Sequence, residues 1–372
     1  MTVPDLPWRQ GPFHARRLGR SFLLKAGALF GMMILMRQHA GLDLSQQFTA
    51  TTIMTTTTST TTLANDTQQQ RDEQQQQREQ QQERFQKYFG HYNYTLPQPR
   101  SHPSQTTRTL PPYDASCGTG PDFAPFFQLG PHVRSRLQED KIIYHSFFRR
   151  FYMNNNNNNH TGGGGGGFIP DNATFVELGA FNGMTESNTR FFGECLGWKG
   201  LLMEGNPGNF QKVLQSRPYE HRMSFAPSCS AEYEAVNRTI PFYIHTQANS
   251  GLPGAAKTYQ GRTTVNVPCG PLGPVLQDIF GSNHQDITFF SLDVEGAERL
   301  VLDTIDFETG PRIHVMMIEV VNNYCPLHQF CLVRNQVREK MAAHGYIRHE
   351  GLVRASDVYV HPESPYQKQT TS

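Results

Sequence analysis

Residues 175–207 read FVELGAFNGMTESNTRFFGECLGWKGLLMEGNP. The apolar start of this stretch leads into a turn that contains Gly179 and Gly183, and apolar residues at helical spacing follow the turn. Gly200 then breaks the helix, and a second apolar run ends at Glu204. This order of strand, glycine turn, helix, strand and acid predicts one βαβ unit that binds an adenosine-type ligand at a helix N-terminus.

The spacing of the glycines indicates which ligand this unit binds. The pattern is Glu-x-Gly-x-x-x-Gly, in place of the Gly-x-Gly-x-x-Gly of dinucleotide-binding proteins. Glu177 stands at the end of the first strand, where its carboxylate can meet the methionine end of S-adenosylmethionine directly or through water. Glu204, about 20 residues beyond the turn, is placed to accept hydrogen bonds from two ribose hydroxyls. An ordinary tight turn of an α/β protein is the alternative. The predicted cofactor-binding residues are Glu177, Gly179, Ala180, Phe181, Gly183, Glu204 and Asn206.

The C-terminal half continues the alternation of strands and helices. Continuous apolar runs predict buried strands at 287–292 and 313–321. The remaining predicted strands are 221–225, 346–349 and 356–360, with an edge or inserted strand at 240–245, and the predicted helices are 209–215, 272–280, 300–305 and 334–344. We therefore expect a single α/β domain over 168–362, with a parallel sheet and helices on both faces. Ligands in such sheets lie beyond the C-terminal ends of the strands.

Acidic residues follow the buried strand 287–292. Because alternate residues of a strand share a face, Asp293 and Glu295 are expected to converge on one site, where one acts as a base or the pair positions an acceptor. Glu298 is expected to brace the following helix, and Glu319 could join the pair. Asp293 and Glu295 could instead only brace the following turn. Three carboxylates would also suit magnesium, but we predict no metal site.

The N-terminal 110 residues differ in composition from the rest. Residues 1–40 are basic and then apolar between 22 and 36, which is shorter than the about 20 residues that a membrane span needs. A signal anchor with a lumenal catalytic domain, in the Golgi or endoplasmic reticulum, is the preferred interpretation; a cleaved signal peptide and an organelle transit peptide are the alternatives. Residues 41–110 are rich in threonine and glutamine without an apolar stripe, so we expect a disordered stem.

Residues 111–167 are expected to hold an amphipathic helix at 132–152 and a flexible insert rich in asparagine and glycine. Residues 363–372 form a tail. The formal net charge is +1, and no basic run interleaved with aromatics occurs after residue 110, so nucleic-acid binding is not expected.

The chain has 6 cysteines without a CxxC spacing, so we do not expect a zinc site. In a lumen they would form two or three disulfides, and Cys325 and Cys331 are close enough in sequence to close a small loop. Sequons begin at Asn65, Asn93, Asn159, Asn172 and Asn237.

The segments VELGAFNGMTESNT, LLMEGNP and SLDVEGAE together resemble the FkbM family of S-adenosylmethionine-dependent methyltransferases. The resemblance covers residues 168–362, and SLDVEGAE is its most specific part. It implies a Rossmann-like sheet of seven strands with the last one antiparallel, and methyl transfer, usually to oxygen. Gly205 departs from many bacterial members, which have proline after the acid.

The expected function is therefore O-methylation of a hydroxyl or carboxyl group on a sugar, a lipid or a small metabolite. The alternative is a lumenal binding or trafficking protein that retains the fold without the chemistry, because fold alone does not establish activity.

Overall fold

The computed structural model of the 372-residue chain consists of two units, Met1–Asn65 and Asp66–Ser372. The structure describes only residues of the second unit: 72–98 with short gaps, 117–118, 122–155 except 133, 173–244, 263–281, 286–320 and 328–368. The predicted N-terminal anchor, most of the asparagine- and glycine-rich insert and the C-terminal residues 369–372 lie outside these ranges.

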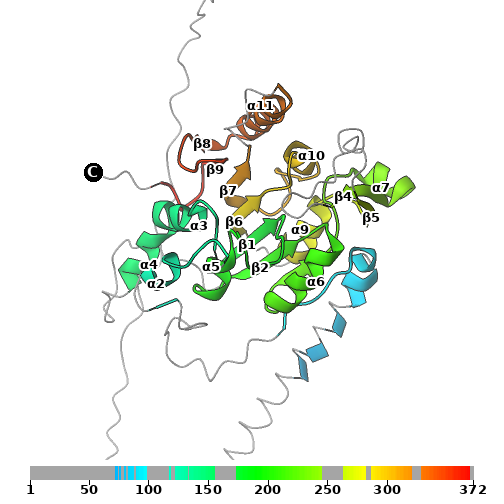
Figure 1. Cartoon of the computed structure of the whole chain (residues 1–372), viewed down its shortest axis with the longest axis horizontal. Helices are drawn as coiled ribbons and strands as arrows, with labels where there is room; N and C mark the ends of the chain where they lie inside the picture. Colours follow the sequence, from blue (N-terminus) through cyan, green and yellow to red (C-terminus); the bar gives the residue numbers. More distant parts are fainter. Residues whose placement is uncertain are drawn as a thin grey trace, which may run out of the picture. The chain divides into compact units, whose positions relative to one another are not determined.

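A seven-stranded sheet organises the second unit, with the strand order β3-β2-β1-β6-β7-β9-β8 (Figure 1). Its strands are β1 (Thr174–Leu178), β2 (Lys199–Met203), β3 (His221–Met223), β6 (Ile287–Leu292), β7 (Ile313–Glu319), β8 (Ile347–His349) and β9 (Ser356–Val360). Neighbouring strands pair in parallel except for β9, which runs antiparallel to both β7 and β8. The predicted Rossmann-like sheet, with its last strand antiparallel, is confirmed.

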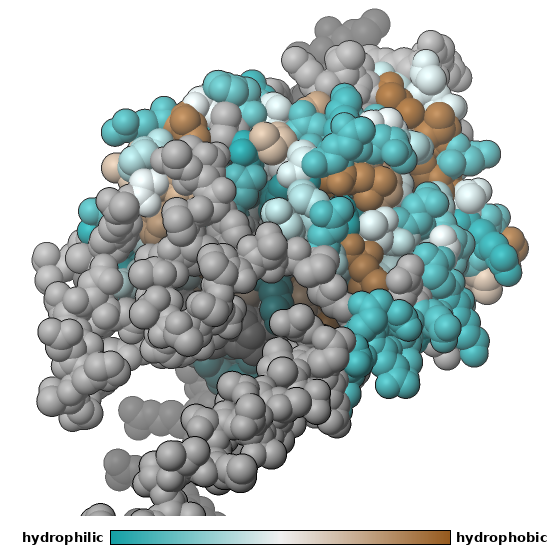
Figure 2. All heavy atoms as spheres, turned by 90° about the horizontal axis from the view of Figure 1, so that it is seen from below, coloured by the Kyte–Doolittle hydropathy of each residue, from teal (hydrophilic) through white to brown (hydrophobic). Residues whose placement is uncertain are grey.

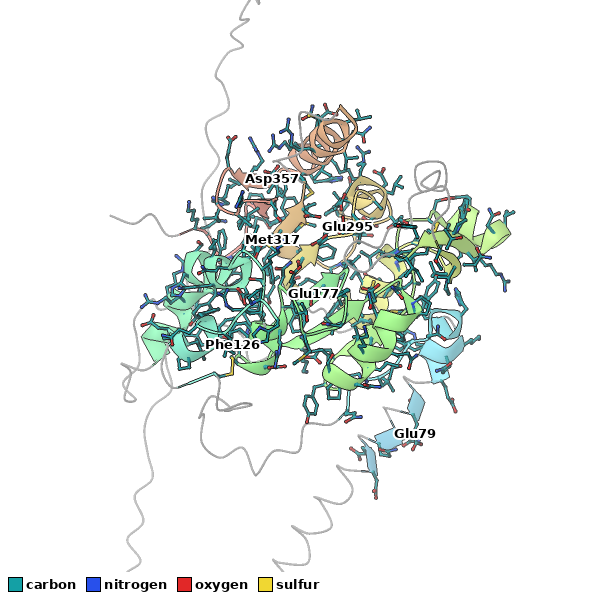
Figure 3. The ribbon with its side chains drawn as sticks, in the orientation of Figure 1. Glu79, Phe126, Glu177, Glu295, Met317 and Asp357 are labelled. Atoms are coloured by element: carbon teal, nitrogen blue, oxygen red, sulfur yellow. A yellow bond between two sulfur atoms is a disulfide. The ribbon has the colours of Figure 1, made fainter. Side chains whose placement is uncertain are left out.

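Helices cover both faces of the sheet because successive strand residues point to opposite sides. In β1, Phe175 belongs to one buried core and Val176 to the other. The core with Val176 packs against α9 (Gly273–Ile279), α10 (Glu298–Asp303) and α11 (His328–Ala343). The core with Phe175 also contains Phe126 and Met317 (Figure 3). It packs against α2 (Ala124–Phe127), α3 (Glu139–Ile143), η2 (Tyr144–Phe148), α4 (Arg149–Asn155), α5 (Arg190–Glu194) and α6 (Pro207–Ser216).

The amphipathic helix predicted at 132–152 begins later than expected. Helix starts at Glu139, after Gln138 with a φ of 65°, and continues through α3, the π-helical turn η2 and α4. Tyr144, Phe147 and Phe148 on this segment are fully buried against the sheet. The segment therefore belongs to the core of the domain.

The prediction of a disordered stem up to residue 110 is wrong for its described C-terminal part. Phe85, Phe89, Tyr92 and Tyr94 are buried in the core with Val176. The backbone of Thr95 also forms an antiparallel bridge with Arg222 in β3. The prediction followed the glutamine-rich composition and overlooked these aromatic residues, which bury enough apolar surface to order the segment.

Gly200 does not break the helix but lies inside β2. A Cβ atom at this position would lie 2.1 Å from the Phe175 ring, so glycine is needed where the two strands pack together. The helix ends earlier, at Glu194, and Gly197 with a φ of 71° begins the approach to the strand.

The strand predicted as an edge or an insertion is confirmed as an insertion outside the main sheet. It is β4 (Thr239–Tyr243), which pairs antiparallel with β5 (Thr264–Pro268), a strand that the sequence pattern did not reveal. The helix α7 (Ala231–Asn237) precedes β4, and the short helix η1 (Gly90–Tyr92) lies in the N-terminal segment.

Disulfides join Cys117 to Cys195 and Cys229 to Cys269, and Cys331 is disulfide-bonded as well. Cys325, the predicted partner of Cys331, lies outside the described residues. The first bond fastens the chain ahead of α2 to the end of α5. The second fastens the insertion to the segment after β3.

Large apolar side chains exposed on the described surface are distributed over several elements. They are Tyr219, Tyr233, Val236, Leu300, Leu332 and Ile347. Figure 2 shows hydrophilic residues interspersed among hydrophobic ones on the coloured part of one face. Within the described part of the chain, no helix has both the length and the apolar character to cross a membrane.

Candidate active site

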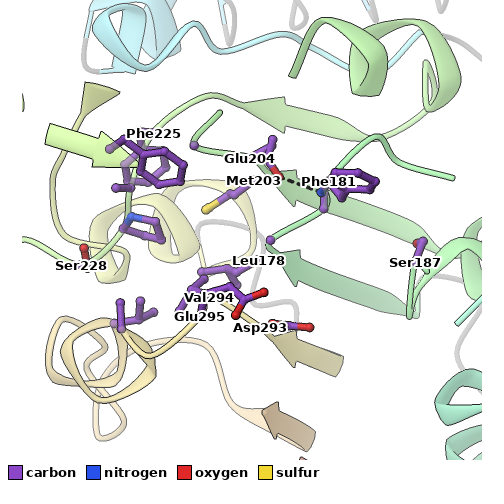
Figure 4. Close-up of a pocket in the computed structure, with 18 of the residues that line it drawn as sticks. Leu178, Phe181, Ser187, Met203, Glu204, Phe225, Ser228, Asp293, Val294 and Glu295 are labelled. Atoms are coloured by element: carbon purple, nitrogen blue, oxygen red, sulfur yellow. Dashed lines mark hydrogen bonds between the residues drawn. The ribbon is translucent and has the colours of Figure 1, made fainter. Parts of the chain in front are cut away.

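A pocket of about 340 Å³ lies at the C-terminal ends of β1, β2 and β6 (Figure 4). Turns after these strands supply its central residues. They are Gly179, Ala180 and Phe181 after β1, Glu204 and Gly205 after β2, and Asp293, Val294 and Glu295 after β6. The pocket therefore lies where a parallel sheet of this type binds its ligand.

Gly179 allows the turns after β1 and β6 to approach each other closely. Its φ is 82°, and a Cβ atom would lie 1.8 Å from the carbonyl oxygen of Asp293. The amides of Gly179 and Ala180 both donate hydrogen bonds to the carbonyl of Met203, which ties the turn to β2. Gly183, by contrast, does not line the pocket; its missing side chain makes room for Ser216 in α6.

Glu204 lines the pocket and is held from two sides. Its Oε2 accepts a hydrogen bond from the amide of Phe181 at 2.7 Å, and its Oε1 accepts one from the amide of Asn206 at 2.7 Å. Burial raises the pKa of Glu204 to about 7, against the opposing effect of these two amides. Each oxygen keeps a second lone pair, so the carboxylate can accept further hydrogen bonds from a ligand.

Glu177 does not line the pocket. Its Oε2 accepts hydrogen bonds from the hydroxyls of Ser187 and Thr189, and its Oε1 accepts one from the amide of Asn188. The carboxylate therefore holds the loop before α5, one residue of which, Ser187, does line the pocket. The expected direct contact of Glu177 with the ligand does not follow from this arrangement.

Asn206 has a similar supporting position. Its side-chain oxygen accepts hydrogen bonds from the amides of Gly208 at 2.9 Å and Asn209 at 3.4 Å, which caps the N-terminus of α6. Its own amide donates to Glu204, so the cap also fixes the carboxylate that faces the pocket.

Asp293 and Glu295 line the same pocket, as expected, but for a different reason from strand alternation (Figure 4). β6 ends at Leu292, and both acids lie in the following turn, where Glu295 has a φ of 55° and Gly296 a φ of 100°. Glu298 accepts hydrogen bonds from the amides of Val294 and Gly296, which confirms that it braces this turn and the start of α10.

Several carboxyl groups around Asp293 interact with one another. Asp293 forms a hydrogen bond with Glu319, and burial raises the pKa of both groups, that of Glu319 well above its usual range because the Asp293 charge adds to the effect. Desolvation and the charges of Asp293 and Glu298 raise the pKa of Glu295, at the pocket surface, to about 7.

The sequence interpretation missed pocket residues that come from segments without a motif. Phe242 comes from the insertion, and Phe225 and Pro227 from the segment after β3. A Cβ atom at Gly205 would lie 2.5 Å from the Phe242 ring. Glycine in place of the proline of many bacterial FkbM proteins therefore leaves room for an aromatic ring over the pocket.

Arg136 is the other pocket residue that was missed, and its guanidinium lies 3.8 Å from the carboxylate of Glu186. Within the described ranges, no group of three or more histidine, cysteine, aspartate or glutamate side chains has a geometry that could hold a metal ion.

The strand order and the pocket define the Rossmann-like methyltransferase class of architecture. Residues 177–347 match the family model described as the methyltransferase FkbM domain. The chain therefore carries a methyltransferase FkbM domain, and the predicted family is confirmed.

Three solved structures are similar to this chain at low identity. A methyltransferase FkbM from Methylobacillus flagellatus KT is 16% identical, with a TM-score of 0.30, over 51% of this chain and 44% of that chain. A fibrillarin/Nop5p complex gives 11% identity and a TM-score of 0.29 over 58% and 80% of the two chains. Aeropyrum pernix fibrillarin with natively bound S-adenosyl-L-methionine gives 11% and 0.25 over 52% and 68%. This chain thus spans less than half the length of the Methylobacillus protein, and no curated protein matches it.

Proposed function

We propose that this protein is an S-adenosylmethionine-dependent methyltransferase that methylates an oxygen of a hydroxyl or carboxyl acceptor. The position of Glu204 carries the proposal: a buried carboxylate, fixed by two amides, opens into a pocket between the Gly179 turn and Asp293. A sugar, a lipid or a small metabolite is the proposed acceptor class.

The residues of the pocket fit this cofactor. Glu204 has free lone pairs for the two ribose hydroxyls, and the Gly179 turn offers a close backbone approach. Asp293 and Glu295 provide negative charge that suits a sulfonium cation. When bound, S-adenosylmethionine supplies an electrophilic methyl group.

Asp293 is the proposed base. Its carboxylate lines the pocket and is hydrogen-bonded to Glu319, which orients it. An acceptor hydroxyl in the pocket would give its proton to Asp293, and the surrounding turns would hold that hydroxyl in line for attack. Glu295, at the pocket surface, would help to position the acceptor.

Calorimetry with the full chain tests the cofactor assignment. We expect binding of S-adenosylmethionine and of its demethylated product, S-adenosylhomocysteine, and no binding of NAD. Binding of NAD without S-adenosylmethionine would contradict the proposal. Binding of S-adenosylmethionine without methyl transfer to candidate sugars, lipids and metabolites would favour the inactive binding protein.

We further propose that the domain works in an oxidising lumen, anchored by the apolar segment 22–36. The disulfides Cys117–Cys195 and Cys229–Cys269 support this proposal, since such bonds persist in oxidising compartments. The sequon residues Asn93 and Asn237 are exposed and accessible to glycosylation. Import into an organelle by a transit peptide is the alternative.

A further inference from the structure

The lining of the pocket combines charged and apolar side chains. Arg136, Glu186 and Asp293 are charged, whereas Phe225, Pro227, Phe242 and Val301 are apolar. Figure 4 shows Phe225 and Ser228 on one side of Glu204 and Ser187 on the other. A ligand that carries both charged groups and a flat apolar ring fits such a lining.

Phe242 lies beside Gly205, the residue that follows the proposed ribose-binding Glu204. Its ring occupies the space where a side chain at Gly205, the residue after Glu204, would otherwise lie. The ring is only 7% exposed, so packing fixes its position. Since the base is attached to the ribose, the adenine ring is the part of the cofactor that would meet Phe242.

The described part of the insertion that carries Phe242 has a small core of its own. Its small core consists of Ala226, Cys229, Ile240, Phe242, Val267 and Cys269, with Ile244 and Val265 packed against it. Two cysteines of this core form the disulfide between the segment after β3 and the end of β5. The backbone adds hydrogen bonds from the amide of Ala226 to Pro268 at 2.8 Å and from the amide of Gly270 to Ala226 at 3.3 Å.

We propose that Phe242 forms the wall of the adenine site and that the Cys229–Cys269 disulfide keeps this wall in place. Cofactor affinity then depends on the redox state of a disulfide outside the main sheet. This inference rests on the proposed function, because it concerns the same pocket. It assigns part of that pocket to an insertion that carries none of the recognised motifs.

Calorimetry with the full chain separates the two parts of the inference. Phe242→Ala should weaken the binding of S-adenosylhomocysteine about tenfold or more, since an aromatic contact and buried apolar area are lost. The same loss is expected for 5′-methylthioadenosine, which lacks the amino-acid end of the cofactor. Phe242→Leu keeps most of the packing in the small core and should show a smaller loss for both ligands.

The disulfide is tested by the double variant Cys229→Ser/Cys269→Ser, with Cys117→Ser/Cys195→Ser as the matched control. We expect the first variant to lower the affinity for both ligands about threefold or more. The control should bind as the wild type does, since its disulfide lies in the core with Phe175. Thermal melting shows which variants are folded before affinities are compared.

Two results would overturn the inference while leaving the proposed function intact. One is that folded Phe242→Ala and Phe242→Leu bind S-adenosylhomocysteine and 5′-methylthioadenosine with the affinity of the wild type. The other is equal loss in the two disulfide variants, which would indicate general loosening. A wild-type chain that binds neither S-adenosylmethionine nor S-adenosylhomocysteine would instead remove the proposed function itself.

Discussion

Replacing Glu204 with alanine tests the centre of the site. The carboxylate is 5% exposed and accepts hydrogen bonds from the amides of Phe181 and Asn206, each at 2.7 Å. Alanine would remove these acceptors at a cost of about 1–3 kcal/mol for each amide that finds no other partner. Burial raises the pKa of Glu204 to about 7, so the variant also loses a carboxylate whose charge is costly to bury. These effects oppose each other, and we expect the fold to survive.

For cofactor binding, no gain offsets the loss of the Glu204 carboxylate. Loss of charge-assisted hydrogen bonds to the ribose should weaken binding by about 1.5–3 kcal/mol, or about 10- to 150-fold. Calorimetry with S-adenosylhomocysteine measures this change, and thermal melting confirms that the variant is folded. Glu339→Gln is the matched control, because Glu339 is exposed on α11 and does not line the pocket. Its affinity should stay within about threefold of wild type. A folded Glu204→Ala with wild-type affinity would exclude Glu204 from the ribose site.

The remaining predictions concern chemistry, backbone, pH and location. Asp293→Asn should lower methyl transfer by about 10²–10⁴-fold with little change in cofactor affinity, and a rate within a few-fold of wild type would rule out a base at this position. Gly179→Ala should prevent binding and lower the melting temperature strongly, because its Cβ atom would lie 1.8 Å from a carbonyl oxygen; wild-type melting would contradict the described turn. Burial raises the pKa of Glu204 from 4.5 to about 7, so the stability that its neutral form contributes is present below pH 4.5 and is lost as the pH rises through 7. Melting curves of the free protein between pH 4.5 and 7.5 should show a smaller fall for Glu204→Gln than for wild type. Glycosidase treatment of the expressed protein should increase its gel mobility, and loss of the sequons at Asn93 and Asn237 should reduce the shift; no shift together with organelle import would favour a transit peptide.

The central strands could be predicted because each is a continuous apolar run between turns. β6 at Ile287–Leu292 has the predicted bounds, and β7 begins at Ile313 as predicted. Gly200 was misinterpreted because a glycine inside a strand looks the same in sequence as a glycine that ends a helix. Its role depends on the Phe175 ring on the neighbouring strand, which only the paired sheet brings near.

The candidate site likewise contains residues that local motifs predict and residues that only the folded chain brings together. Glu204, Gly179 and Asp293 could be found because each follows a strand in a recognisable motif. Glu177 was predicted to meet the ligand directly or through water from its place beside the glycine turn. The sequence did not reveal that the polar loop before α5 donates hydrogen bonds to both of its oxygens. Phe242 could not be predicted, since it reaches the pocket through an insertion with an unrecognised second strand.

The N-terminal segment that packs beside β3 has a practical consequence for handling the protein. β3 is an outer strand of the sheet, and the backbone of this segment pairs with it at Thr95–Arg222 and through the amide of Ser224, which donates to Tyr92. A chain shortened to begin at residue 111 would leave those groups unpaired and would expose the apolar surface beneath. Open strand edges recruit strands from other molecules. Such a shortened chain should therefore aggregate during expression, whereas one that retains the aromatic segment from Phe85 onward should remain dispersed.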